Sequence, residues 1–234
     1  MSIILINPYA VIPSILTDPN FANVTLLAHF DGADGSTTFT DVKDHTMTGA
    51  GNAQLDTDQF KFGTASLLLD GTGDKIDING SSGDFSFGTG DFTIEFWIRI
   101  ASNHTNRAII GNRNASANTF WQVEFFNQAN KIEFHTGAVI VLAGATAISN
   151  NAWHHVAIAR AGTTIKLFIN GTEDDSETNN HNYSSTTTLT IGHDNYGSGG
   201  LTDMAGWLDD IRLTKGVARY TSNFTPPTAA FPNS

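Results

Sequence analysis

The sequence predicts an all-β fold in which two antiparallel sheets pack face to face as a jelly-roll sandwich, preceded by an extended N-terminal arm. Between Phe92 and Ile100 every second residue is apolar, which is the period of a strand with one buried face. Gly and Asn recur between many short apolar segments, as expected where tight turns join consecutive strands. No segment shows a convincing 3.6-residue period, so we expect little helix.

The composition fits one large domain, which we assign to residues 25–234. An apolar content of 40% over 234 residues is enough for a single core. The net charge of −11 argues against nucleic acid as a partner, and no apolar stretch reaches the roughly 18 residues that membrane insertion requires. The absence of cysteine excludes disulfides and thiolate chemistry. The first residues lack the basic start of a secretory signal.

Residues 1–24 are predicted to form the arm. Pro8, Pro13 and Pro19 interrupt an Ile-, Leu- and Val-rich segment that keeps no strand or helix period. Because a contiguous apolar arm is unfavourable in water, it should pack either on its own sandwich or on a neighbouring subunit. The sequence leaves both alternatives open.

The clearest turn in the sequence is Asn170-Gly171, a favoured hairpin dipeptide. It closes a strand over Ile165–Ile169, which follows another strand through Val156 and Ile158. Further strands are expected at Leu26–Phe30, Ser66–Leu69, Lys75–Ile78, Asp91–Ile100, Ala108–Ile110, Phe120–Phe126, Lys131–Phe134, Thr188–Ile191 and Trp207–Leu213.

Several strings, in order along the chain, resemble laminin-G-like domains of the concanavalin A-like lectin/glucanase superfamily. They are Leu26–Phe39, Phe62–Gly71, Asp91–Trp97, Trp153–Ala157, Lys166–Gly171 and Gly206–Tyr220. The resemblance covers about residues 25–231 and implies the same sandwich. The closing string, Thr214–Pro227, is similar to the form common in bacteriophage virion proteins.

The glucanases of this superfamily use acidic residues on one strand, in a Glu-x-Asp-x-x-Glu type arrangement. The sequence has no such string, and Glu124 and Glu133 each stand alone on a predicted strand, where we expect them to point outward into solvent. We therefore predict that the protein is not an enzyme. His154 and His155 are adjacent in a strand, so their side chains should point to opposite faces and not share a metal ion.

Acidic turns near both ends of the domain are candidates for a structural calcium ion, because carboxylates on irregular loops suit hard cations. The predicted ligands are Asp31, Asp70, Asp209 and Asp210, with Asp34 and Asp74 in the same turns. The family resemblance implies an ion between the first and last strands, at Asp31 and Asp210. The alternative is that these carboxylates accept hydrogen bonds from turn amides.

A ligand site is expected on the loops Glu173–Ser185 and His193–Gly200. The candidate residues are Tyr183, His193, Asn195 and Tyr196, which combine ring faces with amide and imidazole groups that suit sugars. Loop aromatics also occur at protein interfaces, so a glycan and a protein remain alternative ligands.

Three functions follow from these observations. The favoured hypothesis is a non-catalytic capsid or tail decoration protein of a phage virion, held to other virion proteins by its arm, forming a homo-oligomer and presenting a lectin-like sandwich to glycans. The first alternative is a free lectin, located outside the cell or on its surface. The second is a glucanase-like hydrolase, which the missing acidic string argues against.

Overall fold

The computed structural model describes residues 17–80, 83–113, 119–125, 129–137, 139–185, 188–194 and 203–234. Within these ranges it confirms the all-β prediction, with fifteen strands and one 3-10 helix, η1 (Phe21–Asn23). No helix in this part of the chain is long and apolar enough to cross a membrane. The strands are β1 (Val24–Ala28), β2 (Thr46–Ala50), β3 (Gln54–Asp56), β4 (Ser66–Asp70), β5 (Lys75–Asn79), β6 (Phe92–Arg99), β7 (Arg107–Gly111), β8 (Gln122–Phe125), β9 (Lys131–Thr136), β10 (Val139–Ala147), β11 (Trp153–Ala161), β12 (Thr164–Ile169), β13 (Thr172–Thr178), β14 (Leu189–Ile191) and β15 (Ala205–Lys215).

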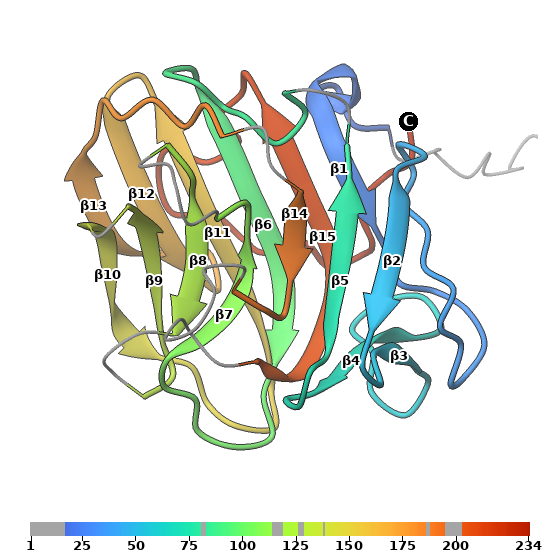
Figure 1. Cartoon of the computed structure of the whole chain (residues 1–234). Coiled ribbons are helices and arrows are strands. Elements are labelled where there is room, and N and C mark those ends of the chain that lie inside the picture. Colours follow the sequence, from blue (N-terminus) through green and yellow to red (C-terminus); the bar gives the residue numbers. More distant parts are fainter. Residues whose placement is uncertain are drawn as a thin grey trace, which may run out of the picture.

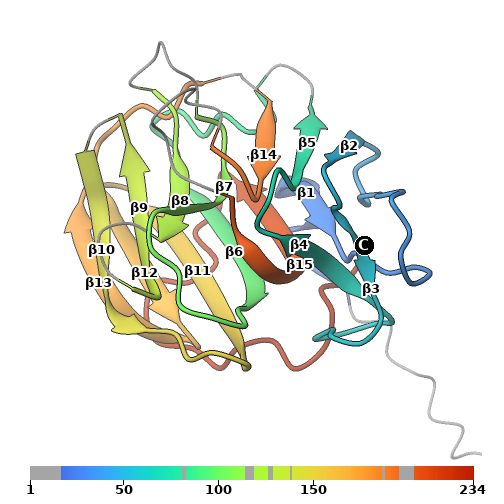
Figure 2. The ribbon, with the colours of Figure 1, turned by 60° about the horizontal axis from the view of Figure 1, so that its bottom comes forward.

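The strands form two antiparallel sheets that lie face to face (Figure 1). Sheet A has eight strands in the order β13-β12-β11-β6-β15-β4-β3, with β1 paired to the second half of β15. Sheet B has seven strands in the order β10-β9-β8-β7-β14-β5-β2. Figure 2 shows the same two layers from below. This is the predicted sandwich.

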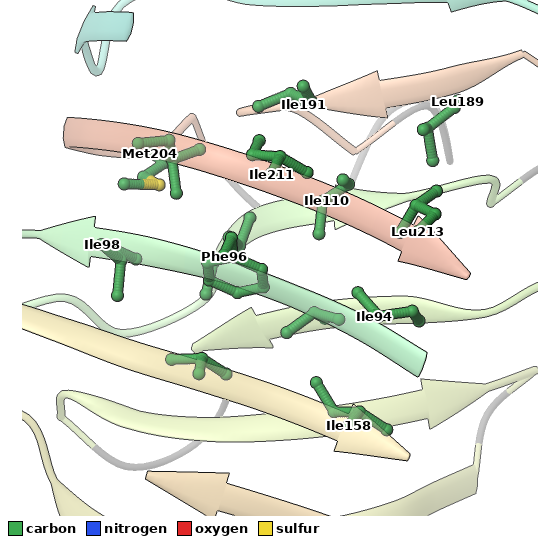
Figure 3. Packing of buried hydrophobic residues seen from close by; sticks show 14 of the residues in the cluster. Ile94, Phe96, Ile98, Ile110, Ile158, Leu189, Ile191, Met204, Ile211 and Leu213 are labelled. Atoms are coloured by element: carbon green, nitrogen blue, oxygen red, sulfur yellow. The ribbon is translucent and has the colours of Figure 1, made fainter. Parts of the chain in front are cut away.

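The core lies between the sheets and is built from the predicted alternation. Ile94, Phe96 and Ile98 of β6 are fully buried on the inner face of sheet A. Figure 3 shows them against Ile110 and Ile191 of sheet B. Burying each such side chain contributes roughly 1.5–3 kcal/mol of transfer free energy.

The outer face of sheet A is covered by the C-terminal segment, residues 216–234. Thr93 Oγ1 donates to the carbonyl of Val217 at 3.0 Å, and Tyr220 Oη donates to Glu95 Oε2 at 2.8 Å. Phe231 is buried with β1, in a small cluster with Val24 and Leu27. The prediction that β6 is half-buried was therefore wrong, since a covering segment buries its polar face as well.

Beneath this segment lies a buried ionic network. Arg212 pairs with Glu95 at 2.8 Å and with Asp18 at 3.1 Å, and Arg219 pairs with Asp18 at 2.6 Å. Burial alone would raise the pKa of Glu95, but Arg212, His155 and the Tyr220 hydroxyl together lower it to about 2. Glu95 is thus held as a carboxylate inside the protein.

Asp18 also corrects the predicted bounds of the arm. Its amide donates to the Ser234 carbonyl at 2.7 Å, and its carboxylate holds Arg212 and Arg219. Residues 18–24 therefore pack on the sandwich, and Val24 already begins β1. The rest of the predicted arm, residues 1–16, lies outside the described ranges.

The predicted hairpin turn joins β12 to β13. Asn170 and Gly171 both have positive φ, 52° and 77°, as this turn type requires. A side chain at Gly171 would collide with the Phe224 carbonyl of the C-terminal segment. The strand after the turn, β13, occupies the first half of the predicted ligand loop Glu173–Ser185, because this polar segment pairs with β12 as a sheet edge.

Candidate functional site

A group of polar side chains occupies the outer face of sheet B. Val123 of β8 and Phe134 of β9 face the core. Because side chains alternate along a strand, the residues next to them on each strand face away from the core. Glu124 and Glu133 are direct cross-strand partners there. Each is only 2% exposed.

His135 joins the two carboxyl groups. Its Nε2 lies 3.2 Å from Glu124 Oε1 and 3.0 Å from Glu133 Oε2. The expectation that these glutamates stand apart in solvent was wrong: adjacent strands bring them together, and both are buried. Glu124 Oε2 has no hydrogen-bond partner within the described ranges.

Burial decides the charge state of this cluster. It raises the pKa of Glu124 to about 8. The positive charge of Arg113 lowers this pKa, and the negative charges of Asp194 and Glu133 raise it further. Burial also raises the pKa of Glu133, and it lowers the pKa of His135 to about 4, with a further contribution from Arg113. Near neutral pH the imidazole and the Glu124 carboxyl are therefore both neutral, so they can donate and accept hydrogen bonds.

The cluster borders the second predicted ligand loop. Arg113 Nη1 pairs with Asp194 Oδ2 at 2.8 Å at the end of β14. The neighbouring His193 pairs through Nδ1 with Asp203 at 2.5 Å and keeps 36% of its side chain exposed. His193 is thus an accessible polar group, whereas the other predicted residues of this loop, Asn195 and Tyr196, lie outside the described ranges.

Tyr183 does not agree with its predicted role as a surface ring. It is fully buried, packs edge-on against Phe92 and Phe134, and donates its hydroxyl to Asn179 at 3.0 Å. Burial raises its pKa. The cause is a bridge between Gly88 and Tyr183, which draws this segment in against the core.

Two predicted calcium ligands, Asp31 and Asp70, serve as acceptors for turn groups. Asp31 Oδ1 accepts from the amide of Thr64 at 2.5 Å. Asp70 accepts from the Thr72 amide at 2.8 Å and from the Asn52 side chain at 3.1 Å. Both carboxylates are exposed.

The other two, Asp209 and Asp210, are buried in a bulge of β15. Asp209 accepts from the amides of Lys61 and Phe62, yet burial raises its pKa to about 7. Asp210 accepts from His29 at 2.5 Å and from the Phe231 amide at 2.8 Å. Among the described residues no three His, Asp or Glu side chains form a group that could hold a metal ion. The calcium site stays a prediction.

The fold is a two-sheet sandwich of the lectin and glucanase type, and comparison with known proteins gives its family. Residues 70–218 match the family described as the concanavalin A-like lectin/glucanases superfamily. The match covers more than half of the chain, so the chain belongs to this superfamily. No curated protein matches the sequence.

Many solved structures share the fold. They include the binding domain of Paraclostridial Mosquitocidal Protein 1, with a TM-score of 0.63 and 14% identity over 84% of this chain and 50% of that one. The botulinum neurotoxin serotype D binding domain is similar with a TM-score of 0.60 and 19% identity, over 85% of this chain and 49% of that one. A third is domain 4 of AbnA, a GH43 extracellular arabinanase from Geobacillus stearothermophilus, in complex with arabinotriose. Its TM-score is 0.57 and its identity 17%, over 84% of this chain and 94% of that one. The chain thus spans about half the length of the toxin domains and nearly all of the arabinanase domain.

Proposed function

We propose that the chain is a non-catalytic, lectin-like module that binds glycans on the outer face of sheet B. The observation that carries the non-catalytic part of the proposal is the Glu124–His135–Glu133 cluster, whose two carboxyl groups are each only 2% exposed and therefore closed to a substrate. Sugar hydroxyls need partners that donate and accept, and His193 offers such a group at the accessible rim.

The comparisons support this reading at the level of the fold. Domain 4 of the arabinanase holds arabinotriose, and the chain matches 94% of that domain. The two toxin structures are binding domains. Each supports recognition, and not catalysis, as the use of this sandwich.

We place the module on a phage virion, in the capsid or tail, among other virion proteins. Two features of the sequence support this setting: the closing string Thr214–Pro227 and the apolar segment of residues 1–16. Deleting residues 1–16 while keeping Asp18 should leave the sandwich folded and abolish incorporation into particles. Normal incorporation of the shortened chain would contradict the setting and favour a free lectin.

Glycan binding is tested by calorimetric titration with arabinotriose and with a panel of neutral and acidic oligosaccharides. His193→Ala should weaken binding about fivefold, the loss of about one hydrogen bond. Tyr196→Ala tests the adjoining predicted residue. His154→Ala is the matched control, since this histidine contacts Ser149 beside β11 of sheet A and should not affect binding. No binding by any oligosaccharide, or equal affinities for the histidine variants, would contradict the proposal.

A glycoside hydrolase is the second candidate, favoured by one observation. Two carboxyl groups face each other across β8 and β9, and the raised pKa of Glu124 suits a general acid. Assays for reducing ends with laminarin, agar and arabinan should detect no turnover. Turnover that disappears in both Glu124→Gln and Glu133→Gln would establish the hydrolase instead.

A further inference from the structure

β10 and β13, the last strands of sheet B and sheet A, lie side by side on one flank of the sandwich (Figures 1 and 2). A groove runs along them. We call it the edge groove. It consists of two adjoining hollows of about 430 and 410 Å³, which share Val139, Val141, Thr178 and Asn179. One wall is aliphatic and comes from β10. The other carries Asp175 and Glu177 of β13.

Carboxylates of sheet A cap one end of the β10 edge. Asp175 accepts from the Ala143 amide at 2.7 Å, and Asp174 accepts from the Thr146 amide at 3.0 Å. Toward the start of β10, no such side-chain cap occurs among the described residues. Val139 is 61% and Ile140 42% exposed there. An edge strand with exposed apolar residues is a template for an added strand.

The chain itself contains a segment that fits this edge. Residues 2–7, Ser-Ile-Ile-Leu-Ile-Asn, combine high strand propensity with apolar side chains, and residues 1–17 carry no charged side chain. Pairing β10 with the β10 of a second copy would bring the acidic wall of one groove against that of the other. An uncharged arm avoids this repulsion while covering Val139 and Ile140.

The arm leaves from the opposite flank. Asp18 is bonded to Ser234, and the C-terminus lies on the β2 side of the molecule in both views, away from β10 and β13 (Figures 1 and 2). The fourteen residues from Ile4 to Thr17 are thirteen residue steps, which span about 45 Å when extended. A path over the surface of a domain this size, from flank to flank, is about 70 Å. The arm is therefore too short for its own groove and long enough for a neighbour's.

We propose that the edge groove receives the arm of a neighbouring copy, with residues 2–7 added as a strand beside β10. This inference rests on the proposed role of the arm in assembly and names a second copy of the chain as its partner. The contact joins two different surfaces, so it extends from copy to copy into a ring or a filament.

The absence of cysteine allows a direct test on the full chain. Ile4→Cys and Ile140→Cys are made on separate chains, mixed under mild oxidation, and examined by non-reducing electrophoresis and mass spectrometry. We expect a disulfide between Ile4→Cys and Ile140→Cys at a yield at least tenfold above that with Phe60→Cys. Phe60 is the matched control because it is 43% exposed and lies outside the groove. Equal yields with the two partners would overturn the proposal.

Two further outcomes are decisive. A chain carrying both Ile4→Cys and Ile140→Cys should cross-link between copies, and a monomer closed by an internal disulfide would show that the arm lies in its own groove. Predominant cross-links between two Ile4→Cys arms would show that arms pair with each other. Either result refutes the proposal. Glycan titration of Ile140→Cys should match the unmodified protein; a chain that cross-links as expected but binds no glycan would refute only the glycan function.

Discussion

Replacing Glu95 by Gln tests the buried network under the C-terminal segment. Glu95 is fully buried. It forms an ion pair with Arg212 at 2.8 Å and accepts a hydrogen bond from the Tyr220 hydroxyl at 2.8 Å. The amide of Gln keeps the shape and one acceptor oxygen, but it removes the charge that compensates Arg212. The variant therefore isolates the electrostatic part of the network.

The size of the effect follows from the pKa of Glu95, which lies at about 2 against 4.5 for a free glutamate. A difference of this size corresponds to about 3 kcal/mol of unfolding free energy above pH 6. Because the folded-state pKa is the lower one, this stability is fully present above about pH 6 and is lost as the pH falls through 4.5 toward 2. At pH 3 about 1 kcal/mol should remain.

Urea unfolding followed by tryptophan fluorescence at pH 7 and pH 3 measures the difference between Glu95→Gln and the unmodified protein. Glu173→Gln serves as the control, since Glu173 pairs with Lys166 at 2.7 Å on the exposed side of β13 and should change stability by less than about 1 kcal/mol. A loss at pH 7 no larger than the control's, or a loss that is the same at pH 3, would falsify the argument.

Two further predictions concern titration and metal. Burial raises the pKa of Glu124 to about 8, so the folded state binds a proton more tightly than the unfolded state, and stability should fall by about 3 kcal/mol between pH 5 and pH 8. Glu124→Gln should remove this decline. If the melting temperatures of the variant and the unmodified protein change equally between pH 5 and pH 8, the raised pKa of Glu124 is ruled out. If calcium is bound at Asp31 and Asp210, chelation should lower the melting temperature and added calcium should restore it; melting unchanged by EDTA and calcium in metal-free buffer would leave these carboxylates as turn acceptors alone.

The central strands could be predicted from the sequence, and the outermost ones could not. β2, β3, β10 and β13 were all missed, and each is the last strand on one side of a sheet. Edge strands are exposed on more than one side, so they lose the alternation that marks a strand with one buried face. β13 shows this most clearly, since Thr172–Thr178 contains no apolar residue at all.

The candidate site escaped prediction for a different reason. Glu124 and Glu133 are nine residues apart in the sequence, and only the register of β8 with β9 makes them neighbours. A search for carboxylates on one strand cannot find a pair divided between two. The alternating pattern did indicate that both face away from the core, but it could not show that they would be buried there. The prediction for Tyr183 was wrong in the opposite direction, since a ring expected at the surface is buried. Its backbone bridge to Gly88 is a long-range contact that the local sequence does not show.

The position of Asp18 has a mechanical consequence for any assembly held by the arm. A pull on the chain before Asp18 is transmitted through Asp18, whose carboxylate pairs with Arg212 and Arg219. Arg212 belongs to β15, which is bonded to β6 on one side and to β1 on the other. Force on the arm therefore reaches the middle of sheet A before β1 can separate from β15. Several hydrogen bonds must break together before the module unfolds.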